Sequence, residues 1–259
     1  MKVALKVGYD GTRFEGSQVQ PAPAKTVEGE FLRVLGKLGI EDARPRWAGR
    51  TDAGVSALGN VAAIETDFDF GELPKALNAN LNHVWVTGIA KVGPRFNPRF
   101  ARERWYRYHF WNEDWDVRAA KRAASIFVGE HDFINFARIE EDKDPVRKLT
   151  RVGLERDGEW LLLDVRGENF LWQMVRRIGG AVRSVGLGKC KFTDVERALE
   201  GEKPQGRGFE PLPPEPLWLM DVEYDFTFQK VAPGHPIHVR RRKASLHARL
   251  MDSAARSDE

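Results

Sequence analysis

The segment Arg104-Trp105-Tyr106-Arg107-Tyr108-His109-Phe110-Trp111 decides how this chain is organised. A β-strand turns successive side chains to opposite faces, so Tyr106, Tyr108 and Phe110 share one face and the residues between them share the other. Aromatic rings on both faces are typical of a strand in the interior of a sheet. We predict that this strand opens the second half of the chain. Its tyrosines are either packing residues or, in the case of Tyr106, part of a site.

Residues 1–103, which precede this strand, mix strands with helices. Side chains alternate through Val3–Tyr9 with the period of a half-buried strand. A 3.6-residue apolar stripe behind a Thr26 cap predicts a helix over Val27–Leu38. Further strands are expected at Val61–Ile64 and Val84–Val92, and a further helix around Lys75–Asn80. These elements form a first α+β half.

Residues 104–228 follow a similar loose plan. Asp157-Gly158 lies between two alternating runs, which predicts a hairpin in which Val152 and Leu154 pair with the strand Trp160–Val165. The elements expected after the hairpin are a helix over Phe170–Val185, a short helix with Thr193 and Glu196 at capping-box spacing, a Pro-rich loop over Pro204–Pro216, and a last strand over Leu217–Phe226.

The expected fold is therefore α+β, with two similar mixed halves, each a mostly antiparallel sheet with helices, and an active-site cleft between the halves. We expect residues 1–103 to carry the catalytic loop, residues 104–228 to form the second half, and residues 229–259, with Arg240–Lys243, to be a basic C-terminal extension.

Composition excludes several classes of protein. A chain of 259 residues with 42% hydrophobic content is long enough for a well-buried core. Its single cysteine, Cys190, cannot form an intramolecular disulfide, and no His/Cys cluster has zinc-ligand spacing. The sequence contains no dinucleotide-binding or P-loop fingerprint and no apolar run that would span a bilayer. We expect a cytoplasmic protein that needs no metal, no cofactor and no membrane.

Arginine clusters point to a polyanionic partner. The formal net charge is only +3, so the argument depends on where the charges lie. Arginines are interleaved with aromatic residues in one stretch, which contains Arg95, Phe96, Arg99, Phe100, Arg102, Arg104, Trp105, Tyr106, Arg107 and Tyr108. A guanidinium both binds phosphates and stacks on bases, so RNA is the partner class that we expect.

The loop Ala48-Gly49-Arg50-Thr51-Asp52-Ala53-Gly54-Val55 places one carboxylate between glycines. Gly49 and Gly54 permit backbone angles and close approaches that a side chain would block. Arg50 would either hold Asp52 ionised or clamp a phosphate. A surface turn with a salt bridge has the same composition. The loop alone therefore leaves a reactive site and a structural turn both open.

Taken together, these segments resemble the TruA-type tRNA pseudouridine synthases, and the similarity runs from Val3 to about Phe226. It rests on several motifs in one order, which is more specific than any single motif. The motifs are Tyr9-Asp10-Gly11-Thr12, Thr26-Val27-Glu28-Gly29, Gly49–Val55, Arg104-Trp105-Tyr106-Arg107-Tyr108, Phe170-Leu171-Trp172-Gln173-Met174-Val175-Arg176, and Leu217.

The resemblance implies that uridine is isomerised to pseudouridine in the tRNA anticodon stem-loop, at the positions that follow the anticodon, with the target base flipped out of its stack. Asp52 would be the nucleophile, attacking either the ribose anomeric carbon or the uracil ring. Arg50 would orient Asp52 and help to hold the nucleotide, and Tyr106 would pack on the base. Further substrate contacts are expected from Leu217, Gln18, Thr51, Arg107, Arg176 and Phe170. The resemblance also implies a homodimer.

The chain departs from the commoner bacterial pattern, which often has tryptophan where Ser17 stands and histidine where Ser56 stands. Arg177 replaces a frequent asparagine, and Pro216 precedes Leu217 where glycine is usual. These departures indicate a divergent, archaeal-like branch. Three alternatives stay open: an RNA-binding protein or RNA chaperone on the same scaffold, a synthase that acts on another RNA site, and a glycoside hydrolase, for which no second carboxylate is marked.

Overall fold

The computed structural model describes residues 1–20, 24–41, 43–112, 114–141, 143–204, 206 and 208–231. The chain forms two compact units, one of Met1–Arg102 with the segment from Trp218 onward, and one of Glu103–Leu217. The predicted boundary at residue 103 lies one residue away, but the last strand belongs with the first unit. This strand pairs in parallel with the strand that begins at Ser56, with Trp218 opposite Ser56. The two strands are far apart in the sequence, so local patterns could not predict that the chain returns to the first unit.

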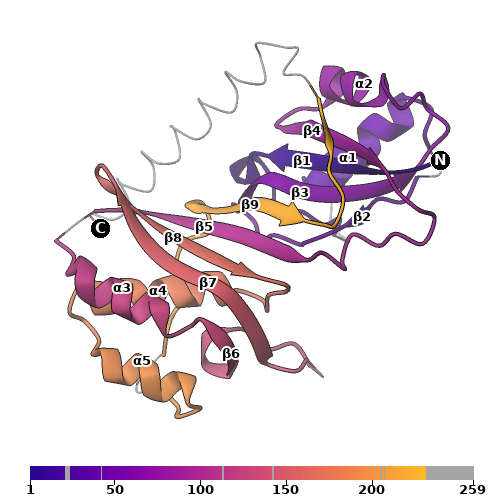
Figure 1. The fold of residues 1–259 in the computed structure, drawn as a ribbon. Coiled ribbons are helices and arrows are strands. Elements are labelled where there is room, and N and C mark those ends of the chain that lie inside the picture. The colour runs from indigo at the N-terminus through magenta and orange to yellow at the C-terminus, as the bar shows by residue number, and fades with distance from the viewer. Residues whose placement is uncertain are drawn as a thin grey trace. The chain divides into compact units, whose positions relative to one another are not determined.

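The first unit is built on a sheet in the order β10-β4-β1-β3-β9 (Figure 1). The central strand β1 is antiparallel to β3 and β4, and β9 is parallel to β3. The predicted strand at Val61–Ile64 is longer in the structure, where β3 begins at Ser56. Gly59 and Asn60 are not apolar, so they hid the first part of the strand from the pattern although both are buried. The strands are β1 Lys2–Tyr9, β2 Arg46–Trp47, β3 Ser56–Glu65, β4 Val84–Lys91, β9 Leu217–Glu223 and β10 Gln229–Lys230.

The second unit has an antiparallel sheet in the order β5-β8-β7-β6. The predicted hairpin is confirmed: Val152 pairs with Val165, Leu154 pairs with Leu163, and Gly158 takes the positive φ of 61° that the turn needs. The predicted two faces of β5 are also confirmed, since Tyr106 and its face-mates are buried while their neighbours are half-buried. The strands are β5 Glu103–Trp111, β6 Gly129–Asp132, β7 Val146–Asp157 and β8 Trp160–Gly167.

Three α-helices accompany this sheet: α3 Val117–Ser125, α4 Met174–Gly186 and α5 Phe192–Leu199. The prediction that a helix begins at Phe170 was wrong, because Gln173 takes a left-handed φ of 62° and α4 starts only after it. The prediction that Thr193 and Glu196 form a capping box was also wrong. The helix begins two residues earlier, where Asp194 accepts a hydrogen bond of 3.1 Å from the backbone N–H of Lys191. The sequence patterns did not predict α3 and β6.

The fold is thus α+β with mostly antiparallel pairing, as predicted. The last strand ends at Glu223, earlier than predicted. The first residues of the predicted extension form β10 on β4, where Gln229 lies opposite Ile89. The basic run Arg240–Lys243 lies outside the described residues. Among the described helices, none combines the length and the apolar character that crossing a bilayer requires.

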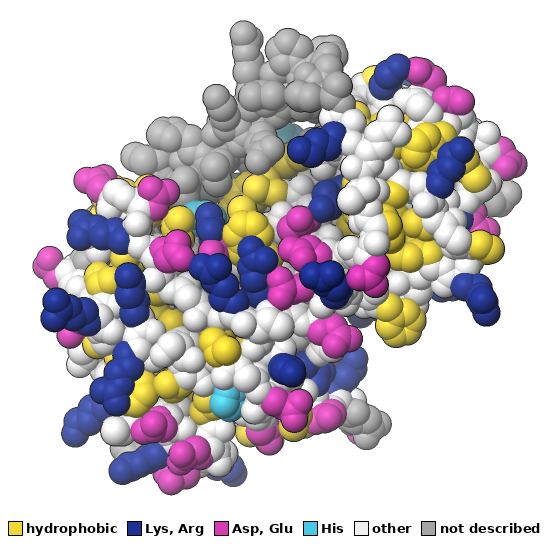
Figure 2. Space-filling view, in the orientation of Figure 1, with side chains coloured by type: hydrophobic (Ala, Val, Ile, Leu, Met, Phe, Trp, Pro, Cys, Tyr) yellow, Lys and Arg dark blue, Asp and Glu magenta, His cyan; other side chains and the backbone are white. Residues whose placement is uncertain are grey.

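Charged side chains of both signs are interspersed on the face of the molecule that Figure 2 shows. In the face that Figure 2 shows, Lys and Arg side chains lie among Asp and Glu side chains and do not form one continuous basic field. This agrees with a formal net charge of only +3. Any RNA contact therefore has to be found at particular places and cannot be read from the total charge.

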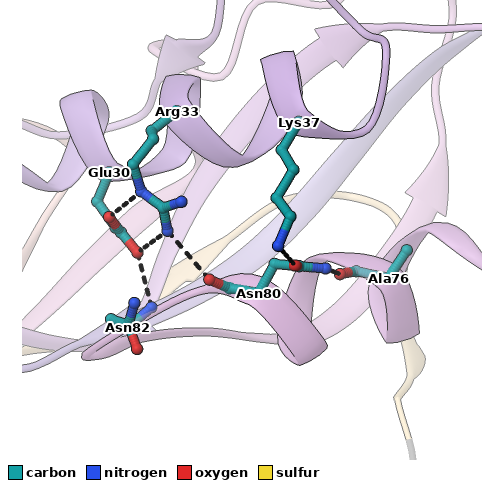
Figure 3. A network of polar contacts seen from close by, with 6 residues as sticks. All are labelled: Glu30, Arg33, Lys37, Ala76, Asn80 and Asn82. Carbon is teal, nitrogen blue, oxygen red and sulfur yellow. Dashed lines mark hydrogen bonds and ion pairs between the residues drawn. The ribbon is translucent and has the colours of Figure 1, made fainter.

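In the first unit, α1 (Val27–Lys37) and α2 (Leu73–Asn80) are joined by a polar network (Figure 3). The predicted Thr26 cap of α1 is confirmed by a hydrogen bond of 3.1 Å from the N–H of Gly29. The Glu30 carboxylate accepts two hydrogen bonds of 2.8 Å from Arg33 and one of 2.7 Å from the N–H of Asn82. Glu30 therefore fixes the segment that follows α2 and leads into β4.

We expect Glu30→Gln to lower the free energy of unfolding by about 1 kcal/mol near pH 7, because it removes charge-assisted hydrogen bonds from a side chain that is only 10% exposed. Burial by itself would raise the pKa of Glu30, but the hydrogen bonds from Arg33 and Asn82 outweigh it and lower that pKa. A lowered pKa stabilises the fold above the unfolded-state pKa, and the effect is lost as the pH falls through the folded-state pKa. Urea unfolding should therefore show the difference shrinking below about pH 4.

Glu72→Gln is the matched control for this experiment. Glu72 also pairs with a cation three residues later, Lys75, at 2.7 Å, but the two side chains are 60% and 69% exposed. An exposed pair of this kind contributes little, so the change should stay within about 0.3 kcal/mol. Equal effects of the two substitutions would show that the Glu30 network does not stabilise the unit.

Candidate active site

The Asp52 loop lies where the end of β1 meets the start of β3. After β1 the chain turns at Gly11, whose N–H donates a hydrogen bond of 3.0 Å to Ser56 Oγ. A Cβ atom at Gly11 would lie 1.9 Å from the carbonyl oxygen of Val55. Only glycine permits this approach of two backbone segments. The turn after β1 therefore presses directly against the end of the Asp52 loop.

Thr51, the residue before Asp52, is held on both its backbone and its side chain. Its N–H donates to Ser17 Oγ at 2.8 Å, and its carbonyl accepts from the Ser17 N–H at 3.1 Å. The Ser17 hydroxyl also donates to that carbonyl at 3.3 Å. The Thr51 hydroxyl lies 3.0 Å from the Tyr9 hydroxyl. Because Ser17 is buried, these bonds fix the peptide that leads into Asp52.

Asn60 completes this support from within β3. Its side chain is fully buried, and its Nδ2 donates to Tyr9 Oη at 3.1 Å and to the Gly49 carbonyl at 3.0 Å. Burial raises the pKa of Tyr9 to about 12, although its hydrogen bonds to Thr51 and Asn60 act the other way. Tyr9 therefore stays neutral, and the network behind the loop adds no charge beside Asp52.

The loop places its polar side chains at different depths. Asp52 and Thr51 are half-buried, while Arg50 and Gln18 are exposed. Asp10, the carboxylate of the turn after β1, is buried and accepts hydrogen bonds from the N–H and the hydroxyl of Thr12 at 3.1 and 2.7 Å. Asp10 therefore has a capping role, whereas Asp52 is half-buried and so partly accessible to solvent.

The second unit contains the other predicted site residues. Tyr106 is 7% exposed, and its ring meets Phe170 edge-on, with centroids 5.0 Å apart and an interplanar angle of 76°. Leu217 is buried at the end of the Pro-rich loop. Arg176 donates from Nε to the carbonyl of Leu212 in that loop at 2.6 Å. The structure thus brings Tyr106 and Phe170 into direct contact.

Arg107 is engaged within the protein. Its guanidinium binds the buried carboxylate of Asp164 through two hydrogen bonds of 2.8 Å each, and Trp105 Nε1 donates to the same carboxylate at 2.7 Å. The hydrogen bond to Asp164 is the main reason that the pKa of Arg107 is raised. The bidentate pair that Arg107 on β5 makes with Asp164 on β8 therefore joins the two strands.

Sequence reasoning missed the residues that support the loop. Ser17 and Ser56 drew attention only as departures from the bacterial pattern, and the structure gives both a hydrogen bond to the loop region. Asn60 was available as a signal, because an amide inside an apolar run is expected to have buried partners. In the part of the chain that the structure describes, no group of three or more His, Cys, Asp or Glu side chains is arranged to hold a metal ion.

A rigidly held loop that presents one reachable aspartate is suited to nucleophilic chemistry by a carboxylate. Many enzymes use a carboxylate in this way, and comparison with known proteins identifies the family to which this chain belongs. The family model described as tRNA pseudouridine synthase matches residues 123–225. A Thermococcus kodakarensis protein named tRNA pseudouridine synthase A is 46% identical over 86% of this chain and 85% of its own length. The proteins of that name from Pyrococcus horikoshii and Methanosarcina acetivorans are 43% and 38% identical, covering 86% and 97% of this chain and 85% and 94% of their own lengths.

The chain belongs to the tRNA pseudouridine synthase family, and it is accordingly an isomerase. Among solved structures, the archaeal box H/ACA sRNP Nop10–Cbf5 complex has a TM-score of 0.34 at 16% identity, with 70% of this chain and 44% of that chain covered. This structural likeness is too weak to bear on the site.

We expect Asn60→Ala to lower kcat by at least about 10-fold, because it releases both Tyr9 and the Gly49 carbonyl and so loosens the loop that carries Asp52. Single-turnover measurements, made at a temperature where circular dichroism shows the variant to be folded, test this. Asn78→Ala is the matched control, since Asn78 also makes two side-chain hydrogen bonds, both to the backbone of Val86. It should keep kcat within about twofold, and a similar loss in both variants would refute a positioning role for Asn60.

Proposed function

We propose that this isomerase converts uridine to pseudouridine in the anticodon stem-loop of tRNA, at the positions that follow the anticodon, with Asp52 as the nucleophile. The observation that carries the proposal is the hydrogen bonding of Thr51 to Ser17 and Tyr9, backed by Asn60, which fixes the backbone that leads into the half-buried Asp52. Membership of the family supports the reaction, and the names of the relatives support tRNA as the substrate.

The reaction is balanced without any external reactant. The bond between uracil N1 and the ribose anomeric carbon breaks, a bond from carbon five of uracil to the same ribose carbon forms, and the proton on carbon five is lost while N1 gains one. The Asp52 carboxylate attacks the ribose carbon or the uracil ring and leaves again when the new bond forms. A carboxylate near a positively charged ribosyl centre has a precedent in the retaining glycosidases.

A paired uridine must leave its stack before a carboxylate can reach it, which costs a few kcal/mol. In the proposed complex Arg50, which is exposed beside Asp52, binds the phosphate of the flipped nucleotide and orients the carboxylate. Tyr106 packs on the base, and its edge-on contact with Phe170 keeps the ring in place. Leu217 provides an apolar contact to the nucleotide. These are the roles that the resemblance to the family implies for the matching residues of this chain.

The remaining proposed contacts differ in how strongly the geometry supports them. Gln18 is exposed next to Ser17, so its side chain is available to the nucleotide. Thr51 would act mainly by holding the loop, because its backbone is bonded to Ser17 and its hydroxyl lies 3.0 Å from that of Tyr9. Arg176 contributes positive charge beside the Pro-rich loop. Arg107 would act mainly by holding Asp164 and the β5 strand that carries Tyr106, because its guanidinium is already bound.

Incubation of unmodified tRNA transcripts with the protein, followed by mapping of pseudouridine at single-nucleotide resolution, tests the proposal. We expect product in the anticodon arm with the wild-type protein, and a fall in rate of at least about 10³-fold with Asp52→Asn, because the amide cannot act as the nucleophile. RNA affinity should stay within about threefold, since Asp52 contributes no attraction to phosphate.

Asp67→Asn is the control for loss of one negative charge, because Asp67 is fully exposed and its partner, the N-terminus, lies 3.6 Å away. It should leave the rate unchanged within about twofold. Full activity of Asp52→Asn would exclude the proposed nucleophile. Pseudouridine at another position of the RNA would show that the proposed target position is wrong and that the proposed reaction is right.

We also propose that the enzyme acts in the cytoplasm as a homodimer, as the resemblance implies. Light scattering on the purified protein should then give twice the mass of one chain, which is 29.4 kDa. The expected dimer mass should be independent of concentration down to about micromolar levels if the interface is of the stable kind. A mass of one chain throughout would exclude a shared-subunit complex with RNA.

A further inference from the structure

Two β-turns that share the sequence Pro-Arg-Phe at their last three positions follow each other shortly after β4. Gly93-Pro94-Arg95-Phe96 is closed by a hydrogen bond of 2.9 Å from the Phe96 N–H to the Gly93 carbonyl. Asn97-Pro98-Arg99-Phe100 is closed by a bond of 3.1 Å from the Phe100 N–H to the Asn97 carbonyl. In each turn proline occupies the second position, where its fixed φ favours a β-turn.

Both turns are anchored to the first unit. The carbonyl of Pro94 accepts a hydrogen bond of 2.8 Å from Lys2 Nζ, and the carbonyl of Pro98 accepts one of 2.6 Å from Tyr224 Oη. The side chain of Asn97 adds a third bond, accepting from the N–H of Arg99 at 3.2 Å. These contacts restrain the backbone of the tandem turns and so fix the points from which their side chains project.

The two phenylalanines end in opposite environments. Phe96 packs edge-on against Tyr224 and Phe226, with ring centroids 5.3 and 5.5 Å apart. Phe100, the equivalent residue of the second turn, is 81% exposed, more than any other large hydrophobic residue in the described part of the chain. The first ring therefore holds the turns to the unit, and the second ring is presented to solvent on a rigid support. Packing within the unit therefore does not explain why an aromatic side chain stands at position 100.

The segment between β4 and β5, which contains Phe100, carries basic residues but no acidic ones. From Lys91 to Arg102 the chain carries four basic residues and no acidic residue. Arg95, Arg99 and Arg102 are all exposed. Arg102 lies 3.8 Å from Asp225, but both side chains are mostly exposed, so that pair is weak and screened. An aromatic ring with guanidinium groups beside it suits a base and its adjoining phosphates.

This surface is separate from the Asp52 loop within the first unit. Lys2, at the start of β1, pairs with Glu65 and donates to Pro94, whereas Tyr9, at the end of β1, contacts Thr51. The strand has eight residues, which is about 23 Å from end to end. The turn at Pro94 and the loop of Asp52 are therefore anchored at opposite ends of the same strand, and the turn that carries Phe100 follows the Pro94 turn directly in the chain. One flipped nucleotide cannot occupy both places.

We propose that Phe100, with Arg95, Arg99 and Arg102, forms a second RNA contact, in which an unpaired base of the substrate stacks on the Phe100 ring and the arginines bind its phosphates. The inference rests on the proposed function for the identity of the partner, because a tRNA offers unpaired bases outside the modified position. It adds to that function a site that binds the RNA and takes no part in the chemistry. Loss of this contact weakens binding and leaves the chemical step to the Asp52 loop.

Equilibrium binding of an unmodified tRNA transcript to the full chain tests the inference. We expect Phe100→Ala to raise Kd by about 10-fold, the loss of one stacked base. Phe100→Trp keeps a stacking ring and should bind as tightly as the wild type, within about twofold. Arg95→Ala should lower the slope of log Kd against log salt concentration by about one, as the loss of one phosphate contact requires.

Ile134→Ala is the matched control, because Ile134 is also an exposed apolar residue, at 52%, but belongs to the second unit. It should not change Kd. Unchanged binding by Phe100→Ala, or equal weakening by Phe100→Ala and Phe100→Trp, would overturn the stacking contact. The failure of the proposed function is a different result: the wild-type protein would bind the transcript in these experiments and yet form no pseudouridine in it.

Discussion

The hydrogen bonds of Asn60 are the constraint on which the candidate active site depends. Its amide lies in the fully buried part of β3, where a polar group without partners would cost about 1–3 kcal/mol. Its partners are the Tyr9 hydroxyl on β1 and the Gly49 carbonyl in the loop. The sheet therefore buries Asn60 at full stability only when the loop supplies the Gly49 carbonyl. The stability of the first unit and the placement of the Asp52 loop are coupled through this side chain.

The elements that carry a local signal were predictable from the sequence. Alternation indicated β1 and β5, the apolar stripe and the Thr26 cap indicated α1, and Asp157-Gly158 indicated the hairpin and its two strands. In each case the signal lies within about a dozen residues and comes from periodicity or from a single turn. The motif of the Asp52 loop is equally local, which is why the amino-acid sequence alone singles out Arg50, Thr51 and Asp52.

The features that the sequence did not predict have a common physical cause. In each case contacts with residues far away in the sequence decide the local structure. The bond between Asn60 and Tyr9 spans 51 positions in the sequence, and β9 returns to β3 from still farther away. The apolar run before α4 reads as helix until Gln173 takes a left-handed φ that no composition rule predicts for glutamine. Local propensity is overridden in each of these places.

The two sites inferred in the first unit suggest a division of labour along β1. At one end a network of neutral, buried hydrogen bonds fixes the loop of Asp52, which suits a step that tolerates little displacement. At the other end a rigid pair of turns presents an aromatic ring and positive charge, which suits recognition of a flexible, charged polymer. In the proposed mechanism base flipping costs free energy at the first site, and the proposed contact at the second would offset it. Binding far from the reacting bond would then be part of how the chemical step is reached.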